Sequence, residues 1–311
     1  MTVALVVLNW NGKEILERFL PEMLQYSKEA TIYVIDNNST DDSIDLLTTE
    51  FPDIKRIINE ENLGYAGGYN AGLKNIKEEL ICLINNDIRV TKNWLPPIIN
   101  FFKNNSNTGI VQPHILDEKE PTSFEYAGAA GGYIDRFGYP FCRGRIFDQI
   151  EQDEGQYNEN QNIFWASGAC LFIRNTLFQE LDGFDVDFFM HQEEIDLCWR
   201  ANNIGSKVFC VGDSKVYHLG GASLPESPLK VFYNYRNSIY MLLKNVPALQ
   251  LPFILCCRLL LDGVAGIRFL LKGELRNCLS ILKAHAYMYY NFFKMLGKRS
   301  SKKPNNSYFK L

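Results

Sequence analysis

Two groups of carboxylates directly follow apolar or aromatic stretches of the sequence. Asp87 follows two amides at the end of the mostly apolar run 80–84, and Glu193 and Glu194 open a helical pattern after an aromatic stretch. A lone carboxylate beside amides suits a hard divalent cation that keeps positions open for a phosphate group. A carboxylate projecting from a helix start can act as a general base. The plainer interpretations are a polar turn and a match to the helix dipole.

Two further features point to a ligand site. His218 stands at the end of a strand-like segment before two glycines, so its imidazole is a second candidate ligand for a cation at Asp87; a structural role is the alternative. The stretch 62–72 is rich in glycine, which lets the backbone approach a ligand closely, and Asn62 and Asn70 could hydrogen-bond to it. Its spacing matches neither the dinucleotide fingerprint nor a phosphate loop, and a connection without a ligand remains the alternative.

The strands that would position these groups are recognisable in the first 90 residues. Apolar runs at 3–8, 31–35, 54–58 and 80–84 alternate with helical patterns, and polar residues or glycine follow them. Such alternation predicts an α/β fold with a mostly parallel sheet. The carboxyl edge of that sheet gathers the strand ends into one crevice, which is typical of a nucleotide-binding domain.

The second half of the chain supplies the opposite wall of the expected crevice. Residues 117–162 are polar and rich in glycine, and we interpret them as a long functional loop on the acceptor side. Ordered structure resumes at 164–174. Asp196 lies one helical turn before Arg200, so we expect these two residues to form a structural ion pair.

Composition excludes several classes of protein. The 311 residues are 46% hydrophobic and 13% aromatic, which supports a packed core rather than disorder. The eight cysteines lack a metal-ligand spacing, and the N-terminus reads as a strand rather than a secretory signal. These features predict reduced, buried thiols and a cytosolic location.

Charge is distributed unevenly along the chain. Residues 228–311 hold 14 basic and two acidic residues, a charge of +12, so the first 227 residues, with 18 basic and 34 acidic residues, carry −16. Such asymmetry indicates an anionic partner for the C-terminal part. No nucleic-acid-reading motif accompanies the charge, so we expect no nucleic acid to bind.

Arg258, Asp262 and Arg268 interrupt an apolar segment at 251–271. On a helical wheel these three residues and the following Lys272 and Arg276 form a charged stripe about 120° wide. This stripe favours a helix lying in an anionic membrane interface over one that crosses the membrane. The alternative is a helical pair packed on the catalytic domain, with its charges facing water.

Taken in order, the motifs resemble glycosyltransferase family 2, and more narrowly its rhamnosyltransferase-like branch. The motifs are Asn9-Trp10-Asn11, Val34 through Asp41, Asn62 through Gly72, Ile84 through Asp87, Trp165 through Ala169, Gly183-Phe184-Asp185, Glu193 through Leu197, and His218. The resemblance covers roughly residues 1–240. It implies a GT-A fold, Rossmann-like and nucleotide-binding, over 1–240. The charge and the helical wheel, not the resemblance, predict a basic, amphipathic, membrane-associating helical region over 241–311.

The resemblance also implies an activity and its residues. The expected reaction is the inverting, metal-dependent transfer of a sugar, with rhamnose from dTDP-rhamnose as the first choice, to a saccharide or lipid-linked acceptor in bacterial surface polysaccharide synthesis. The implied site comprises Glu194 and Glu193 as candidate bases; Asn9, Asn11, Asp36, Asn62, Gly64, Gly68, Asn70, Asn85 and Asn86 around the nucleotide sugar; Trp165, Ser167 and Gly168 on the acceptor side; and Asp87 and His218 as ligands of Mg²⁺ or Mn²⁺.

Two departures from the family pattern leave alternatives open. Glu194 stands where the family usually has aspartate, and Asn85 replaces the first acid of the Asp-x-Asp motif. A catalytically silent sugar-nucleotide-binding or scaffold protein is therefore the competing interpretation, whereas a nicotinamide dehydrogenase would need the missing fingerprint. We expect a cytoplasmic protein attached peripherally to the inner face of the plasma membrane. Homo-oligomerisation, the donor, the acceptor and the linkage stay open.

Overall fold

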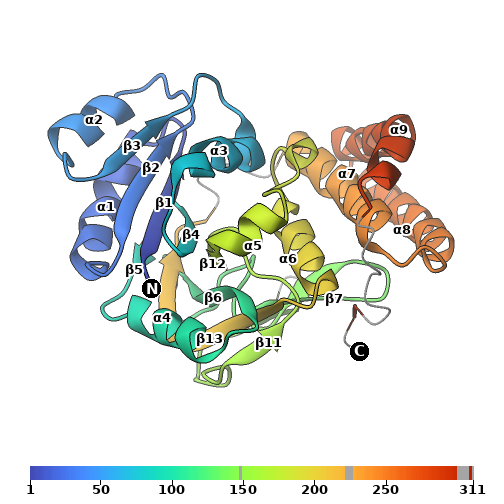
Figure 1. Ribbon diagram of the computed structural model, residues 1–311. Coiled ribbons are helices and arrows are strands. Elements are labelled where there is room, and N and C mark those ends of the chain that lie inside the picture. The colour runs from blue at the N-terminus through green and yellow to red at the C-terminus, as the bar shows by residue number, and fades with distance from the viewer. Residues whose placement is uncertain (147–148, 221–226, 300–307, 310–311) are drawn as a thin grey trace.

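The computed structural model describes residues 1–146, 149–220, 227–299 and 308–309 (Figure 1). The strands are β1 (Val3–Asn9), β2 (Thr31–Asp36), β3 (Lys55–Ile58), β4 (Leu80–Asn85), β5 (Ile88–Val90), β6 (Thr108–Asp117), β7 (Gly132–Ile134), β8 (Pro140–Cys142), β9 (Arg145–Ile146), β10 (Gln149–Ile150), β11 (Gln161–Ile163), β12 (Cys170–Arg174) and β13 (Lys207–His218). The α-helices are α1 (Lys13–Tyr26), α2 (Ser43–Thr49), α3 (Gly64–Gly72), α4 (Leu95–Asn104), α5 (Asn175–Glu180), α6 (Glu193–Asn203), α7 (Pro228–Asn245), α8 (Leu251–Leu271) and α9 (Leu275–Gly297).

One large sheet carries the strand order β11-β13-β6-β12-β4-β1-β2-β3, with β5 added beside β13. Strands β4, β1, β2 and β3 all run parallel, as the alternation of strands and helices predicted. Strand β12 then enters antiparallel between β4 and β6, and β13 lies parallel to β6. The predicted α/β fold is confirmed, and its second half adds antiparallel neighbours to the parallel core.

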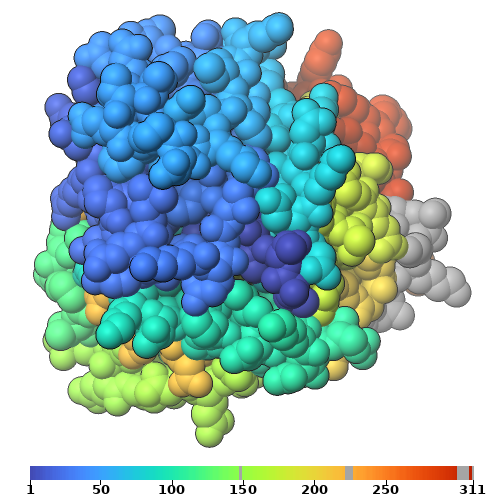
Figure 2. Space-filling model, turned by 60° about the vertical axis from the view of Figure 1, so that its left-hand side comes forward, coloured from blue at the N-terminus to red at the C-terminus, as the bar shows by residue number. Residues whose placement is uncertain are grey.

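Helices cover both faces of this sheet. In β1, Val3, Leu5 and Val7 pack with α1, α2 and α4, whereas Ala4 and Val6 pack with α3 and α6 on the other face. A strand covered on both sides needs apolar residues at successive positions, which explains the uninterrupted hydrophobic runs of β1 and β4. Figure 2 views the molecule from the side of the N-terminal half, whose helices (blue) lie at the opposite end from α9 (red).

The glycine-rich stretch is a helix rather than the expected loop. Helix α3 spans it, and its glycines permit close packing on the sheet. A Cβ atom added to Gly68 would lie 2.9 Å from Leu8, and one added to Gly72 would lie 2.2 Å from Ile35. Each glycine costs about 1 kcal/mol of helix propensity relative to alanine, so this packing is what favours the helix here.

Residues 117–162 are also more ordered than expected. A second sheet, in the order β10-β9-β8-β7, occupies part of the predicted loop. Trp165 covers Gly132 in β7, and the two residues form a bridge whose backbone N–H···O distance is 3.1 Å. The small sheet thereby supports the segment that follows it, which contains the predicted acceptor-side residues.

The C-terminal helices α7, α8 and α9 pack on one another at one end of the molecule, and α7 joins them to α6 (Figure 1). Helix α7 continues through residue 240, the expected domain boundary. Arg258 and Asp262 are buried, which corrects the expectation that the charged stripe of α8 faces outward along its whole length; Arg268, Lys272 and Arg276 are exposed. None of the described helices combines the length and the apolar character that crossing a bilayer requires.

The prediction that the cysteine thiols are buried is confirmed for six of the eight residues. All eight cysteines are free; Cys256 is exposed and Cys257 half-buried, while the others are buried.

Candidate active site

The carboxyl ends of β1, β2 and β4 meet in a network of amides. Asn9, which is buried, donates from Nδ2 to Asp36 (3.1 Å) and accepts at Oδ1 from Asn86 Nδ2 (3.0 Å). Asp36 also accepts from the backbone N–H of Ser39 (2.8 Å). Asn11 has φ = +49° and accepts from the backbone N–H of Thr40 (2.7 Å), which links the two strand ends. The structure therefore brings Asn9, Asn11, Asp36 and Asn86 together.

The start of α3 forms the next part of this edge. Asn37, at the end of β2, donates to Asn62 Oδ1 and to the carbonyl of Gly64, each at 3.0 Å. Gly64 has φ = +68°, a backbone conformation that strongly favours glycine, and an added Cβ would lie 2.6 Å from the Phe189 ring. Asn62 and Gly64 thus shape the edge next to Asn37, and Gly68 packs against the same side chain.

Asn70 lies in the expected region but has a structural partner. Its Nδ2 donates to the carbonyl of Phe184 (2.7 Å), and its Oδ1 accepts from the N–H of the same residue (2.9 Å). Both amide atoms are therefore engaged in holding the turn before Asp185. Asn85 is half-buried, and its backbone N–H donates to the carbonyl of Ala169 (2.9 Å), which places the end of β4 beside the acceptor-side segment.

Asp87 and His218 come together as predicted. His218 Nε2 lies 3.1 Å from Asp87 Oδ1, and His218 Nδ1 lies 3.4 Å from Glu125 Oε1. Burial by itself would lower the pKa of the imidazole, but the carboxylates of Asp87 and Glu125 outweigh it and raise the pKa of His218 to about 10. Glu125 belongs to the long segment before β7, and no local sequence pattern predicts its approach to His218.

This cluster fits a divalent cation only in part. The Asp87 Oδ1 atom is buried, and its neighbour in the structure is the imidazole of His218 at 3.1 Å. Because the pKa of His218 is raised to about 10, the imidazole would have to lose its proton before both groups could bind a cation. Carboxylate oxygen and imidazole nitrogen both suit Mn²⁺, and carboxylate suits Mg²⁺. Within the described part of the chain, however, no set of three or more His, Cys, Asp or Glu side chains is arranged to hold a metal ion. Asp87 and His218 would leave most coordination positions to a phosphate ligand and water.

The two candidate bases differ in exposure. Glu193 is almost fully buried and Glu194 is half-buried, and the Oε2 atom of each makes no hydrogen bond to a described residue. Burial raises the pKa of Glu194 to about 7. Burial and then the nearby charge of Glu194 raise the pKa of Glu193 well above its usual range. A carboxylate that ionises near neutral pH can accept a proton and release it again, which favours Glu194.

Of the three predicted acceptor-side residues, Gly168 adjoins Glu194. A Cβ added to Gly168 would lie 3.7 Å from the Glu194 Cβ and 3.0 Å from Tyr65 Oη, and that hydroxyl donates to the carbonyl of Gly168 (2.6 Å). Ser167 Oγ donates to the carbonyl of Ala127 (2.8 Å), and Trp165 Nε1 donates to the carbonyl of Tyr133 (2.8 Å). Ser167 and Trp165 therefore hold the segment, while Gly168 is the residue that faces Glu194.

The backbone that leads into α6 is strained. Phe189, His191 and Gln192 have φ values of +63°, +68° and +68°, a region in which each non-glycine residue costs on the order of 1 kcal/mol. Asn237 on α7 compensates by donating to the carbonyls of Phe188, Met190 and His191, at 3.0, 2.7 and 2.7 Å. Arg236 donates to the carbonyls of Asp187 and Phe188, each at 2.9 Å. Helix α7 thus fixes the entry to the helix that carries both glutamates.

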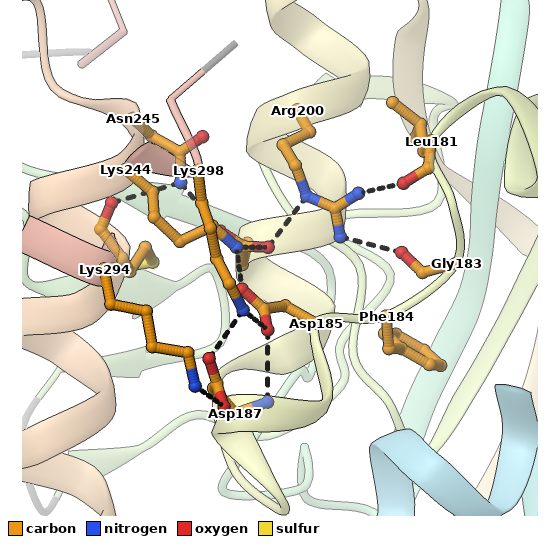
Figure 3. A network of polar contacts seen from close by, with 12 residues as sticks. Leu181, Gly183, Phe184, Asp185, Asp187, Arg200, Lys244, Asn245, Lys294 and Lys298 are labelled. Carbon is orange, nitrogen blue, oxygen red and sulfur yellow. Dashed lines mark hydrogen bonds and ion pairs between the residues drawn. The ribbon is translucent and has the colours of Figure 1, made fainter. Parts of the chain in front are cut away.

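A buried charge network holds the same helix from its far side (Figure 3). Asp196 accepts from Lys244 Nζ, Arg200 Nε and Asn245 Nδ2, each at 2.8 Å, which confirms the predicted Asp196–Arg200 pair. Although burial raises the pKa of a carboxylic acid, the charges of Lys244 and Arg200 lower the pKa of Asp196 overall.

The network continues into α9. Lys298 binds Asp185 (2.5 Å) and Asp187 (2.6 Å), and Lys244 also binds Asp185 (2.8 Å). Sequence reasoning missed these residues on α7 and α9. The available signal was the set of polar residues Arg236, Asn237, Lys244 and Asn245 within an otherwise apolar helix.

Comparison with known proteins identifies the class of this site. The model of the family described as glycosyl transferase family 2 matches residues 4–182. An N-acetylglucosaminyl-diphospho-decaprenol L-rhamnosyltransferase of Mycobacterium tuberculosis is 22% identical over 245 residues, which are 74% of this chain and 80% of that protein. A dTDP-rhamnosyl transferase of Shigella flexneri is 22% identical over 274 residues, 83% of this chain and 85% of that protein.

Solved structures support the same fold. A mannosyltransferase from Pyrobaculum calidifontis, in complex with GDP-Man and Mn²⁺, superposes with a TM-score of 0.55 at 13% sequence identity. The match covers 95% of this chain and 84% of that one. At this level of identity the likeness concerns the fold alone, and it confirms the predicted GT-A architecture.

Proposed function

Because the chain belongs to glycosyltransferase family 2, we propose that it transfers rhamnose from dTDP-rhamnose to a lipid-linked saccharide, with inversion at the anomeric carbon and with Mg²⁺ or Mn²⁺ bound. The names of two relatives support this choice of donor and acceptor: one is a dTDP-rhamnosyl transferase, and the other adds rhamnose to a sugar carried on diphospho-decaprenol. The residues of the site then take the following roles.

The donor binds at the carboxyl ends of β1, β2 and β4. Asp36 and the amides of Asn9 and Asn86 lie together there and can hydrogen-bond to the nucleoside. Asp87 and His218 would hold the cation, and its charge would stabilise the leaving diphosphate. Because the site has one fewer acid than the usual motif, binding of the cation would depend on the diphosphate of the donor.

In this proposal Glu194 activates the acceptor hydroxyl, and the observation that carries the proposal is the environment of the Glu194 carboxylate. The Glu194 carboxylate has a free oxygen, a pKa of about 7, and a position against Gly168 on the acceptor side. It accepts the proton as the hydroxyl attacks the anomeric carbon. Attack from the face opposite the departing diphosphate inverts the configuration at that carbon.

A panel of nucleotide sugars tests the assignment. The purified protein is incubated with dTDP-rhamnose, UDP-GlcNAc and GDP-mannose, with Mn²⁺ or Mg²⁺, and with or without a diphospho-polyprenol-linked N-acetylglucosamine acceptor. We expect slow release of dTDP from dTDP-rhamnose, and acceleration when the acceptor is added. Tight binding of a nucleotide sugar without any turnover would instead identify the protein as a silent scaffold of the same fold.

A further inference from the structure

Helices α8 and α9 each expose a row of large apolar side chains. Large side chains recur on one side of each helix at spacings of four, seven and eleven residues, which keeps them on one face. We call this surface the apolar face and define it by Leu260, Val264 and Leu271 on α8 and by Leu275, Leu282 and Phe293 on α9. The exposed fractions of Leu271 and Phe293 are 85% and 83%. Apolar side chains exposed in such number on one element mark an interaction site in soluble proteins.

The opposite, charged side of α8 is fixed against the domain. The Arg258 guanidinium donates to Ser238 Oγ (2.6 Å) and stacks 3.7 Å from the centre of the Tyr139 ring. Asp262, which is fully buried, lies 3.1 Å from His285 Nε2 on α9. Rotating α8 to hide its apolar side would break these contacts and expose the ring of Tyr139. The contacts of Arg258 and Asp262 therefore fix the orientation of α8 that leaves the apolar face exposed.

Basic residues gather at the turn between the two helices. Arg268, Lys272 and Arg276 are all exposed, and Glu274 is the one acid beside them. The other acid of α8 and α9 is Asp262, which is buried. Aromatic side chains occupy the other end, where Tyr290 is 89% exposed. Apolar surface flanked by basic and aromatic residues is the pattern of helices that lie in a membrane interface.

We propose that the apolar face of α8 and α9 docks on the surface of an anionic lipid bilayer, with both helices lying in the interface and with Arg268, Lys272 and Arg276 among the headgroups. Charge complementarity selects this occupant over a second copy of the chain. A second copy that docked through the same face would bring two basic clusters together, whereas an anionic leaflet supplies negative charge. If the proposed function holds, docking also brings the site to the surface where a lipid-linked acceptor resides.

Binding to vesicles tests the proposal without using activity. The full chain is mixed with vesicles of phosphatidylcholine containing phosphatidylglycerol, or of phosphatidylcholine alone, and the bound fraction is measured by flotation. The test variant is Val264→Glu with Leu271→Glu. Its control is Ile146→Glu with Ile150→Glu, which adds the same charge at exposed apolar residues of β9 and β10. A third variant, Val264→Ser with Leu271→Ser, removes the apolar groups without adding charge.

We expect the full chain and the control to float with the anionic vesicles, and both apolar-face variants to bind at least about tenfold more weakly. Neutralising Arg268, Lys272 and Arg276 to glutamine should weaken binding about fivefold per residue, most strongly at low salt. Failure of the full chain to float would overturn the proposal, and so would equal loss in the control. If the full chain is instead a dimer that the apolar-face variants convert to monomers without any vesicle binding, the face is a contact between copies and the proposal is wrong. None of these outcomes depends on whether the protein transfers rhamnose.

Discussion

Lys244 Nζ lies 2.8 Å from Asp196 Oδ2, so a buried ion pair joins α7 to the helix that begins with both candidate bases. Both side chains are almost completely removed from water. Arg200 binds Asp196 from the same helix, and Asp185 binds Lys244 from the preceding turn. The helix that carries Glu193 and Glu194 is therefore held through Asp196 by the C-terminal helices, while its start is held by Arg236 and Asn237.

Removing the Lys244 charge should destabilise the protein. We expect Lys244→Met to lower the free energy of unfolding by about 3 kcal/mol, the lower end of the range for breaking a buried pair, because Arg200 and Lys298 still compensate the two aspartates. Lys294→Met is the matched control: Lys294 pairs with Asp187 but is 55% exposed, and exposed pairs contribute at most about 1 kcal/mol. Urea unfolding measures the free energy of unfolding of both variants. An equal loss in the two variants would contradict a stabilising role for the buried pair.

The pH dependence of transfer should follow Glu194. Burial raises its pKa to about 7, and a base must be ionised to accept a proton. The rate should therefore reach a plateau above neutral pH and fall by about tenfold for each pH unit below the pKa. The measurement is the transfer rate at saturating donor across this range. A rate that stays constant down to the ordinary glutamic acid pKa of 4.5 would argue against this carboxylate as the base.

Asp87 should be essential for transfer. Substitution by alanine removes the buried carboxylate nearest to His218, and we expect the barrier to rise by several kcal/mol, at about 1.4 kcal/mol for each factor of ten in rate. Binding of Mn²⁺, measured in parallel by electron paramagnetic resonance in the presence of dTDP, should weaken as well. If the variant transfers at the wild-type rate and a chelator still inhibits it, the metal site lies elsewhere.

The local part of the structure was predictable because it depends on short-range patterns. Strands β1 and β4 have apolar residues at successive positions, whereas a strand buried on one face alternates apolar and polar residues. Burial of both faces could therefore be predicted from the sequence. The polar residues after them fall at the carboxyl edge, as the topology of parallel strands requires. Asp196 and Arg200 are one helical turn apart, and this spacing was enough to predict their contact.

The remaining part depends on contacts between distant segments. Glu125 reaches His218 across 93 residues, and Asn237 reaches the carbonyl of His191 across 46. Neither contact has a local signature. The helical wheel correctly placed Arg258 and Asp262 of α8 on the same side of the helix. It contains no information on which side of the helix is buried by the rest of the protein. Helix α3 shows the same limit, since tertiary packing outweighs the poor helix propensity of its glycines.

The measurement that tests the catalytic assignment most directly compares Glu194→Gln with Glu193→Gln in a single-turnover transfer assay with dTDP-rhamnose and the lipid-linked acceptor. Both substitutions preserve side-chain size, and donor affinity is measured alongside by calorimetry. We expect Glu194→Gln to bind the donor normally and to transfer roughly 10²–10⁴ times more slowly, as is usual for the loss of a general base, while Glu193→Gln retains most of its rate. An inactive Glu193→Gln together with an active Glu194→Gln would contradict the assignment of Glu194 as the base.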